Sequence, residues 1–139
     1  MISLIYGGIT HHYLAKDLPY CNTIGNGIGT IHNEYVIAMA GSRDFKLGLL
    51  AGRDSVCGSM AGPISAFRLS DNVDFMLGGY NTNFRNFHER GMEPISVGGI
   101  TPVVGFDFKI PLYEKQDKKL SLDTLVSFGV ITHAINFSF

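Results

Sequence analysis

Hydrophobic and polar residues alternate along most of this chain, most clearly over its last five positions. In an extended strand, Ile135, Phe137 and Phe139 would share one face, and Asn136 and Ser138 the opposite face. No segment shows a convincing helical period, so no helix is expected to cover such apolar faces. The pattern therefore predicts strands closed into a barrel whose apolar outside is covered by lipid.

Turn-forming residues divide the chain into extended segments and polar connections. We expect strands at Ile2–His12, Ile24–His32, Tyr35–Ala40, Phe45–Gly52, Asn72–Gly79, Pro94–Gly99, Val103–Leu112 and Leu120–Phe139. Asn33-Glu34 is predicted to be a tight turn, and 41–44 the following connection. The segment Gly58–Leu69 either extends the fourth strand or forms a strand of its own. Loops are expected at Leu14–Asn22, Asn81–Glu93 and Tyr113–Lys119.

These segments predict an all-β fold, namely an eight-stranded antiparallel up-and-down transmembrane β-barrel formed by residues 1–139 as a single domain. Charged residues alternate with large apolar ones, as where Asp107 and Lys109 lie between phenylalanines and an isoleucine. The side chains expected on the outer surface are Phe75, Leu77, Phe106, Phe108, Ile135, Phe137 and Phe139. By the same alternation His133 falls on the outer face, so it should lie near a rim or at a bulge.

Composition agrees with a membrane barrel. Hydrophobic residues make up 45% of the 139 residues and charged residues 17%, yet the longest apolar run is too short for a transmembrane helix. A net charge of −1 gives no electrostatic basis for binding nucleic acid. We therefore expect a bacterial outer-membrane location, with the lipid bilayer as partner and any export signal already removed. A soluble lipocalin-like barrel or sandwich is the remaining structural alternative.

Four acidic and basic side chains are expected inside the barrel as a self-neutralising network, because buried charges need partners. They are Arg68, Asp74, Asp107 and Lys109. Cys21 and Cys57 are the only cysteines, and their spacing is compatible with a disulfide or with two free thiols. No residue pattern predicts a metal site or a cofactor.

One hydroxyl and imidazole combination could carry chemistry: Ser42 with His12 or His11, each close to an expected strand end. Strands that alternate in direction would bring the first and third connections to the same rim. The alternative is structural, with the histidines bonded to loop backbone and Ser42 forming a turn.

Several segments resemble the outer-membrane lipid A palmitoyltransferase family, an eight-stranded barrel that transfers a palmitoyl chain from phospholipid to lipid A. Ile9-Thr10-His11-His12 resembles the segment with the catalytic histidine, and Ala38-Met39-Ala40 with Ser42 and Ala51-Gly52 resembles the region of the catalytic serine. The segment from Ser96 to Pro111 resembles the strand pair that ends in Ile-Pro. The resemblance implies catalytic roles for His12 and Ser42 and lipopolysaccharide or phospholipid as substrates.

The chain departs from that family at the aspartate that precedes the serine, because Gly41 occupies its place. Asp44 and Asp17 are the nearest acidic residues that could orient a histidine, and both fall in expected loops. The segment Tyr20–Gly29 is instead similar to small barrel-like proteins encoded by tailed phages.

Two functions follow. The first is a non-catalytic membrane barrel whose lumen is filled and whose loops engage a surface or a protein partner. The second is a lipid A acyltransferase, which would need an open, apolar lumen pocket for the acyl chain.

Overall fold

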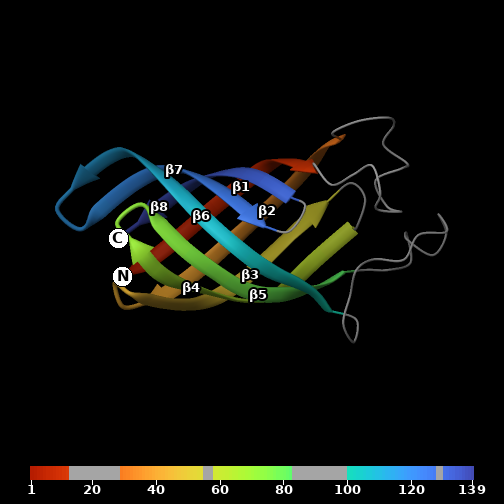
Figure 1. The fold of residues 1–139 in the computed structure, drawn as a ribbon, viewed down its shortest axis with the longest axis horizontal. Coiled ribbons are helices and arrows are strands. Elements are labelled where there is room, and N and C mark those ends of the chain that lie inside the picture. Colours follow the sequence, from red (N-terminus) through yellow and green to blue (C-terminus); the bar gives the residue numbers. More distant parts are fainter. Residues whose placement is uncertain (13–28, 55–57, 83–99, 128–129) are drawn as a thin grey trace.

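The computed structural model describes residues 1–12, 29–54, 58–82, 100–127 and 130–139. They form eight antiparallel strands in which each strand pairs with its neighbours in sequence and β1 pairs with β8, so the sheet closes into an up-and-down barrel (Figure 1). The predicted fold class and strand number are confirmed. Among the described residues, no helix is long and apolar enough to cross a membrane.

The strands are β1 (Ile2–His12), β2 (Gly29–Gly41), β3 (Phe45–Asp54), β4 (Gly58–Ser70), β5 (Val73–Thr82), β6 (Ile100–Lys115), β7 (Lys118–Ser127) and β8 (Val130–Ser138). Their lengths, from 9 to 16 residues, include the about 9–11 residues that a tilted strand needs to cross a bilayer.

The two ends of the barrel differ in how the strands are connected (Figure 1). At one end, called here the turn end, short turns join β2 to β3, β4 to β5 and β6 to β7, and both Met1 and Phe139 lie there. At the other, the loop end, β1 is followed by the segment 13–28 and β5 by the segment 83–99. The predicted loop Leu14–Asn22, both cysteines and the predicted strand Pro94–Gly99 lie outside the described residues.

Two predicted divisions of the chain are wrong in opposite directions, because one predicted turn is strand and one predicted strand is two strands. The segment containing Asn33-Glu34 is not a turn but part of β2, where these residues pair with Asp54 and Arg53 of β3. These polar pairs lie toward the loop end. The predicted closing strand Leu120–Phe139 is two strands, β7 and β8, separated by only two residues.

Other boundaries agree more closely. Strand β1 has the predicted limits, and the ambiguous segment after Gly58 forms a strand of its own, β4. The predicted loop Tyr113–Lys119, in contrast, is largely strand, because β6 continues to Lys115 and β7 begins at Lys118, which leaves a two-residue turn at Gln116 and Asp117. Gln116 takes a left-handed backbone conformation there, with φ of 54°.

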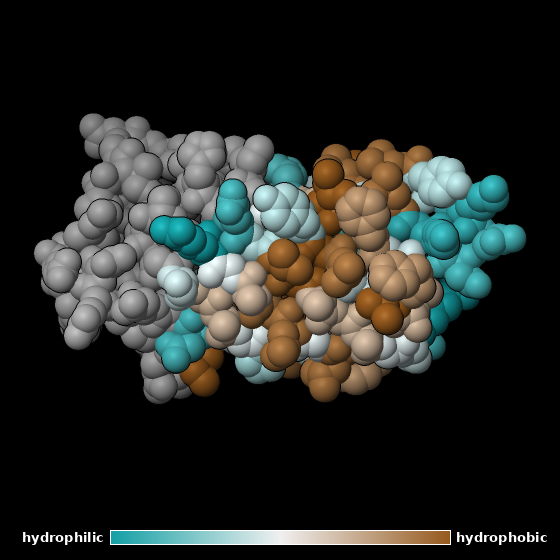
Figure 2. Space-filling view, turned by 180° about the vertical axis from the view of Figure 1, so that it is seen from behind, coloured by the Kyte–Doolittle hydropathy of each residue, from teal (hydrophilic) through white to brown (hydrophobic). Residues whose placement is uncertain are grey.

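Large apolar side chains cover the outside of the barrel, and all eight strands contribute to this apolar belt. Figure 2 shows it as a brown band with hydrophilic residues beyond it at the turn end. The expected outward positions are confirmed, with six of the seven side chains exposed and Phe75 half-buried. Further members include Leu4, Tyr6, Val36, Leu47, Leu49, Phe67, Val104, Ile110 and Leu122.

Phenylalanines form a row on this outer surface toward the turn end. Phe45, Phe67, Phe75 and Phe106 are direct partners across β3, β4, β5 and β6. Successive ring centroids in the row are 4.9, 6.4 and 5.6 Å apart. These distances suit aromatic contacts, and a girdle of aromatic residues is typical of the interfaces of membrane barrels.

Two polar groups on the outer face have hydrogen-bond partners within the sheet. The Ser65 hydroxyl donates to the Leu77 carbonyl oxygen at 2.8 Å. His133 alternates with the inward Ala134, as predicted, and its Nδ1 lies 3.2 Å from the Thr124 hydroxyl. The irregularity expected near His133 lies in the neighbouring strand, where the β1 register shifts between Gly7 and Ile9.

Apolar side chains fill the lumen over its middle and toward the loop end. The buried set is Ile5, Tyr35, Ile37, Met39, Leu50, Met60, Ile64, Ala66, Met76, Leu125 and Ala134. Tyr35 lies directly opposite Gly7 and its hydroxyl is 3.1 Å from that of Thr132. Its ring occupies the space that a side chain at position 7 would need, so Tyr35 projects into the barrel across the space beside Gly7.

Candidate functional site in the barrel lumen

The predicted meeting of His12 and Ser42 at one rim is wrong. His12 ends β1 at the loop end, where it pairs with Gly29, whereas Ser42 follows Gly41 at the turn end. Strand β1 alone spans roughly 33 Å between these ends, at about 3.3 Å per residue. A general base must lie within about 2.6–3.2 Å of the group from which it takes a proton. The mistaken turn at Asn33-Glu34 caused this error, because one extra strand moves Ser42 to the opposite end.

Ser42 has a structural role that its surroundings explain. Its hydroxyl accepts a hydrogen bond from the Phe45 amide at 3.1 Å and donates one to the Phe45 carbonyl at 3.3 Å. These bonds stabilise the turn between β2 and β3, which agrees with the structural alternative. His11 also lies at the loop end, opposite Thr30. The side chains of His11 and His12 lie outside the described part of the structure, and their individual catalytic roles remain untested predictions.

Charged side chains gather inside the barrel toward the turn end, and the predicted network is present. Asp74 forms ion pairs with Lys109 and, at 3.9 Å, with Arg68. Lys109 also lies 3.6 Å from Asp107. These four side chains come from β4, β5 and β6, where adjacent strands bring them to the same level. The network thus balances two cations with two carboxylates, although neither oxygen of Asp107 has a hydrogen-bond partner among the described residues.

A second polar cluster continues around the barrel from this network on β7, β8 and β1, and its Asp123 pairs across the strands with Lys109 of β6. The Asp123 carboxylate accepts hydrogen bonds from the Ser121 hydroxyl and, at 2.7 Å, from the Asn136 amide. Asn136 in turn accepts from Ser3 at 2.8 Å and from Ser138 at 3.2 Å. Asn136 and Ser138 were predicted to share the face opposite the apolar side chains, whereas Asp123 was missed because the closing segment was treated as one strand.

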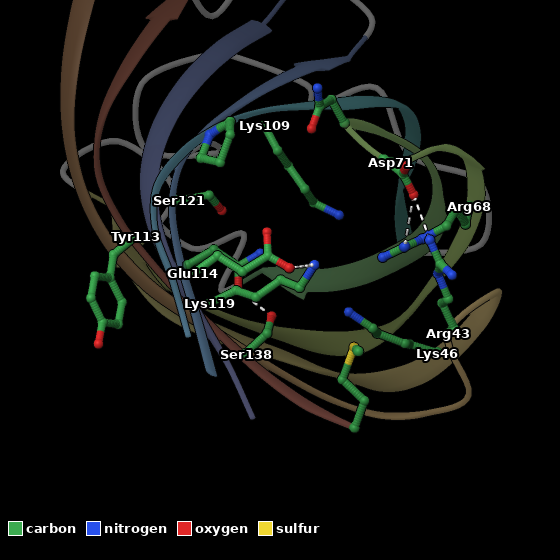
Figure 3. Close-up of a pocket in the computed structure, with 14 residues that line it drawn as sticks. Arg43, Lys46, Arg68, Asp71, Lys109, Tyr113, Glu114, Lys119, Ser121 and Ser138 are labelled. Carbon is green, nitrogen blue, oxygen red and sulfur yellow. Dashed lines mark hydrogen bonds and ion pairs between the residues drawn. The ribbon is translucent and has the colours of Figure 1, made fainter. Parts of the chain in front are cut away.

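A pocket of about 260 Å³ opens from these clusters at the turn end. Figure 3 shows side chains from several strands around it, with the Lys46 and Lys109 side chains reaching into the space. The charged residues that line it are Arg43, Lys46, Arg68, Asp71, Lys109, Glu114 and Lys119. Five cations and two carboxylates therefore surround the pocket, while Asp74, Asp107 and Asp123 are not among its lining residues.

The two lining carboxylates lie at the mouth and are already paired. Asp71 accepts from Arg43 at 2.7 Å and lies 3.6 Å from Arg68, and Glu114 pairs with Lys119 at 2.5 Å. The Arg43 guanidinium holds the pKa of the exposed Asp71 carboxyl below its ordinary value. These pairs link the β2–β3 turn to the β4–β5 turn and β6 to β7 at the mouth.

Lys46 differs from the other lumen cations. It is 3% exposed, and the described residues offer it neither a hydrogen bond nor an ion pair. Its inward direction follows from the predicted alternation with Phe45 and Leu47. Its lack of a partner could not be predicted, because that depends on which neighbours the Asp74 carboxylate engages.

The described residues contain no group of three or more histidine, cysteine or acidic side chains arranged to hold a metal ion. Comparison with protein-family models, curated proteins and solved structures gives no match. The resemblance to lipid A palmitoyltransferases and to small phage barrels is therefore supported only at the level of an eight-stranded barrel with an apolar surface.

Proposed function

We propose that this protein is a small integral outer-membrane barrel without catalytic activity, anchored by its strands and acting through its loop end. The observation that carries the proposal is the apolar belt, to which every strand contributes. A docking site for one protein partner occupies a limited patch, whereas a belt around the whole barrel requires a solvent that surrounds it. Lipid is that solvent.

The filled lumen favours an anchor over an acyltransferase. An enzyme that measures an acyl chain needs an apolar pocket, but Tyr35 and its neighbours occupy the middle of the described lumen. The pocket at the turn end is lined by cations and polar groups, which suit an acyl chain poorly. The distance between His12 and Ser42 removes the pair on which the acyltransferase alternative depended.

Orientation follows from the connections. Outer-membrane barrels place short turns toward the periplasm and longer loops outside the cell. The turn end of this barrel would then face the periplasm, and the segments 13–28 and 83–99 would begin at the cell surface. We propose that these segments contact lipopolysaccharide or a protein partner there.

Cysteine labelling tests both the location and the orientation. In a variant with Cys21 and Cys57 replaced by serine, single cysteines are introduced by Ser59→Cys near the loop end or Asp117→Cys in the turn after β6. A membrane-impermeant maleimide should label Ser59→Cys in intact cells, and Asp117→Cys only after the outer membrane is permeabilised. Equal labelling of both in intact cells, or recovery of the protein in the soluble fraction, would contradict the proposal.

Mass spectrometry of lipid A tests the absence of catalysis. Cells that make the protein should contain lipid A of the same mass as cells that make a His12→Ala variant or no protein. An added acyl chain that depends on His12 would instead establish the acyltransferase alternative.

A further inference from the structure

We propose that the turn-end pocket binds a phosphate-class oxyanion between Lys46, Arg68 and Lys109. This inference concerns the lumen at the turn end and is independent of what the loop end contacts. It begins with the arrangement of charge: the pocket wall is cationic, and its two carboxylates are engaged at the mouth.

Lys46 supplies the second observation. A buried ammonium without a partner is unfavourable unless something compensates its charge. Asp74, a carboxylate of the inner network, already forms ion pairs with Arg68 and Lys109. An anion in the pocket would supply the missing partner, and the pocket gives Lys46 room to reach it (Figure 3).

The chemistry of the lining fits a tetrahedral oxyanion. Lysine ammoniums and an arginine guanidinium form charge-assisted hydrogen bonds to phosphate oxygens. Ser121 and Ser138 also line the pocket, with their hydroxyls donated to Asp123 and Asn136. A volume of about 260 Å³ is far more than the about 10–15 Å³ that one water requires, so a phosphate group can enter. A free phosphate and a phosphomonoester lipid headgroup both present this group at the mouth.

The test uses the full-length protein folded in a zwitterionic detergent without phosphate, titrated with inorganic phosphate in a calorimeter at constant ionic strength. Wild-type protein should give a saturable binding curve. Lys46→Met should weaken binding by about tenfold or more, because it removes one charge-assisted partner. Lys115→Met is the matched control: it makes the same charge change at an exposed residue of β6 that does not line the pocket. It should alter binding by less than about twofold.

Phosphate should also raise the melting temperature of wild-type protein, since a ligand that binds only the folded state stabilises it. This measurement needs no variant, and Lys46→Gln replaces Lys46→Met if the latter fails to fold. Titration with short-chain phosphatidic acid distinguishes the source: tighter binding than inorganic phosphate identifies a lipid headgroup, and equal or weaker binding identifies a free phosphate. No binding of either by the wild type, or equal binding by Lys46→Met, would overturn the proposal.

Discussion

Gly7 and Tyr35 lie directly opposite each other on β1 and β2, and a Cβ atom added to Gly7 would come within 2.1 Å of the Tyr35 ring. The ring cannot easily move away, because it is buried in the lumen core and its hydroxyl is 3.1 Å from that of Thr132. The small residue on one strand therefore allows the large residue on the next to fill the barrel.

Replacing Gly7 with alanine should lower the free energy of unfolding by about 1–3 kcal/mol, because it overpacks a filled interior. Urea-induced unfolding in lipid vesicles measures this change. A Tyr35→Leu substitution should relieve the overlap, so the double variant should lose less than the sum of the two single variants. Additive losses would show that the two residues do not compete for the same space.

Breaking a buried ion pair in the lumen should cost much more stability than breaking an exposed ion pair at the mouth. Asp74→Asn leaves Arg68 and Lys109 without their shared carboxylate, and it should destabilise the barrel by about 3–5 kcal/mol. Glu114→Gln breaks an exposed pair with Lys119 at the mouth and should cost less than about 1 kcal/mol. Similar losses for the two variants would contradict the assignment of Asp74 to a buried network.

The outer surface predicts that the cost of a charge depends on depth. Leu49 is 66% exposed on β3 within the apolar belt, so Leu49→Arg should cost about 2–4 kcal/mol of stability in a bilayer. Ser59, on β4, also points to the outer face but lies nearer the loop end. Ser59→Arg should therefore cost only about 0–1 kcal/mol. If the barrel is instead surrounded by water, both substitutions should be nearly neutral when stability is measured without lipid.

Acid should weaken the mouth of the pocket. Arg43 lowers the pKa of Asp71 in the folded state. The pair therefore stabilises the fold at pH values above the unfolded-state pKa of Asp71, and this stabilisation is lost as the pH falls through the folded-state pKa. The stability difference between wild type and Asp71→Asn should therefore be fully present at pH 6, decline as the pH falls below about 4, and vanish only below the folded-state pKa of Asp71. A difference that persists unchanged at pH 3 would show that Asp71 acts through something other than its charge.

Alternation alone predicted the closed barrel, the outward side chains and the inner network around Asp74, because a strand in a bilayer must separate apolar from polar residues. The alternation pattern gave a wrong prediction where β2 approaches the polar loop end. Asn33 and Glu34 look like a turn because two adjacent polar residues interrupt the alternation, yet they pair with β3. That single misplacement created the apparent His12 and Ser42 pair.

The missed division between β7 and β8 has a similar cause, because Phe128-Gly129 carries no strong turn signal and apolar residues continue on both sides. Once the segment is treated as one strand, Asp123 cannot be assigned to the lumen. The pocket at the turn end could not be predicted from the sequence either, since it depends on which side chains from five strands meet at one level of the barrel.

The most direct test of the account is refolding of the urea-denatured protein into phosphatidylcholine vesicles, followed by gel electrophoresis with and without boiling. A closed barrel that crosses the bilayer should float with the vesicles and migrate differently before and after boiling, and Leu49→Arg should reduce the folded fraction more than Ser59→Arg. If the protein refolds without lipid or detergent as a soluble monomer, with no association with the vesicles, the apolar belt is not a membrane surface and the account is wrong.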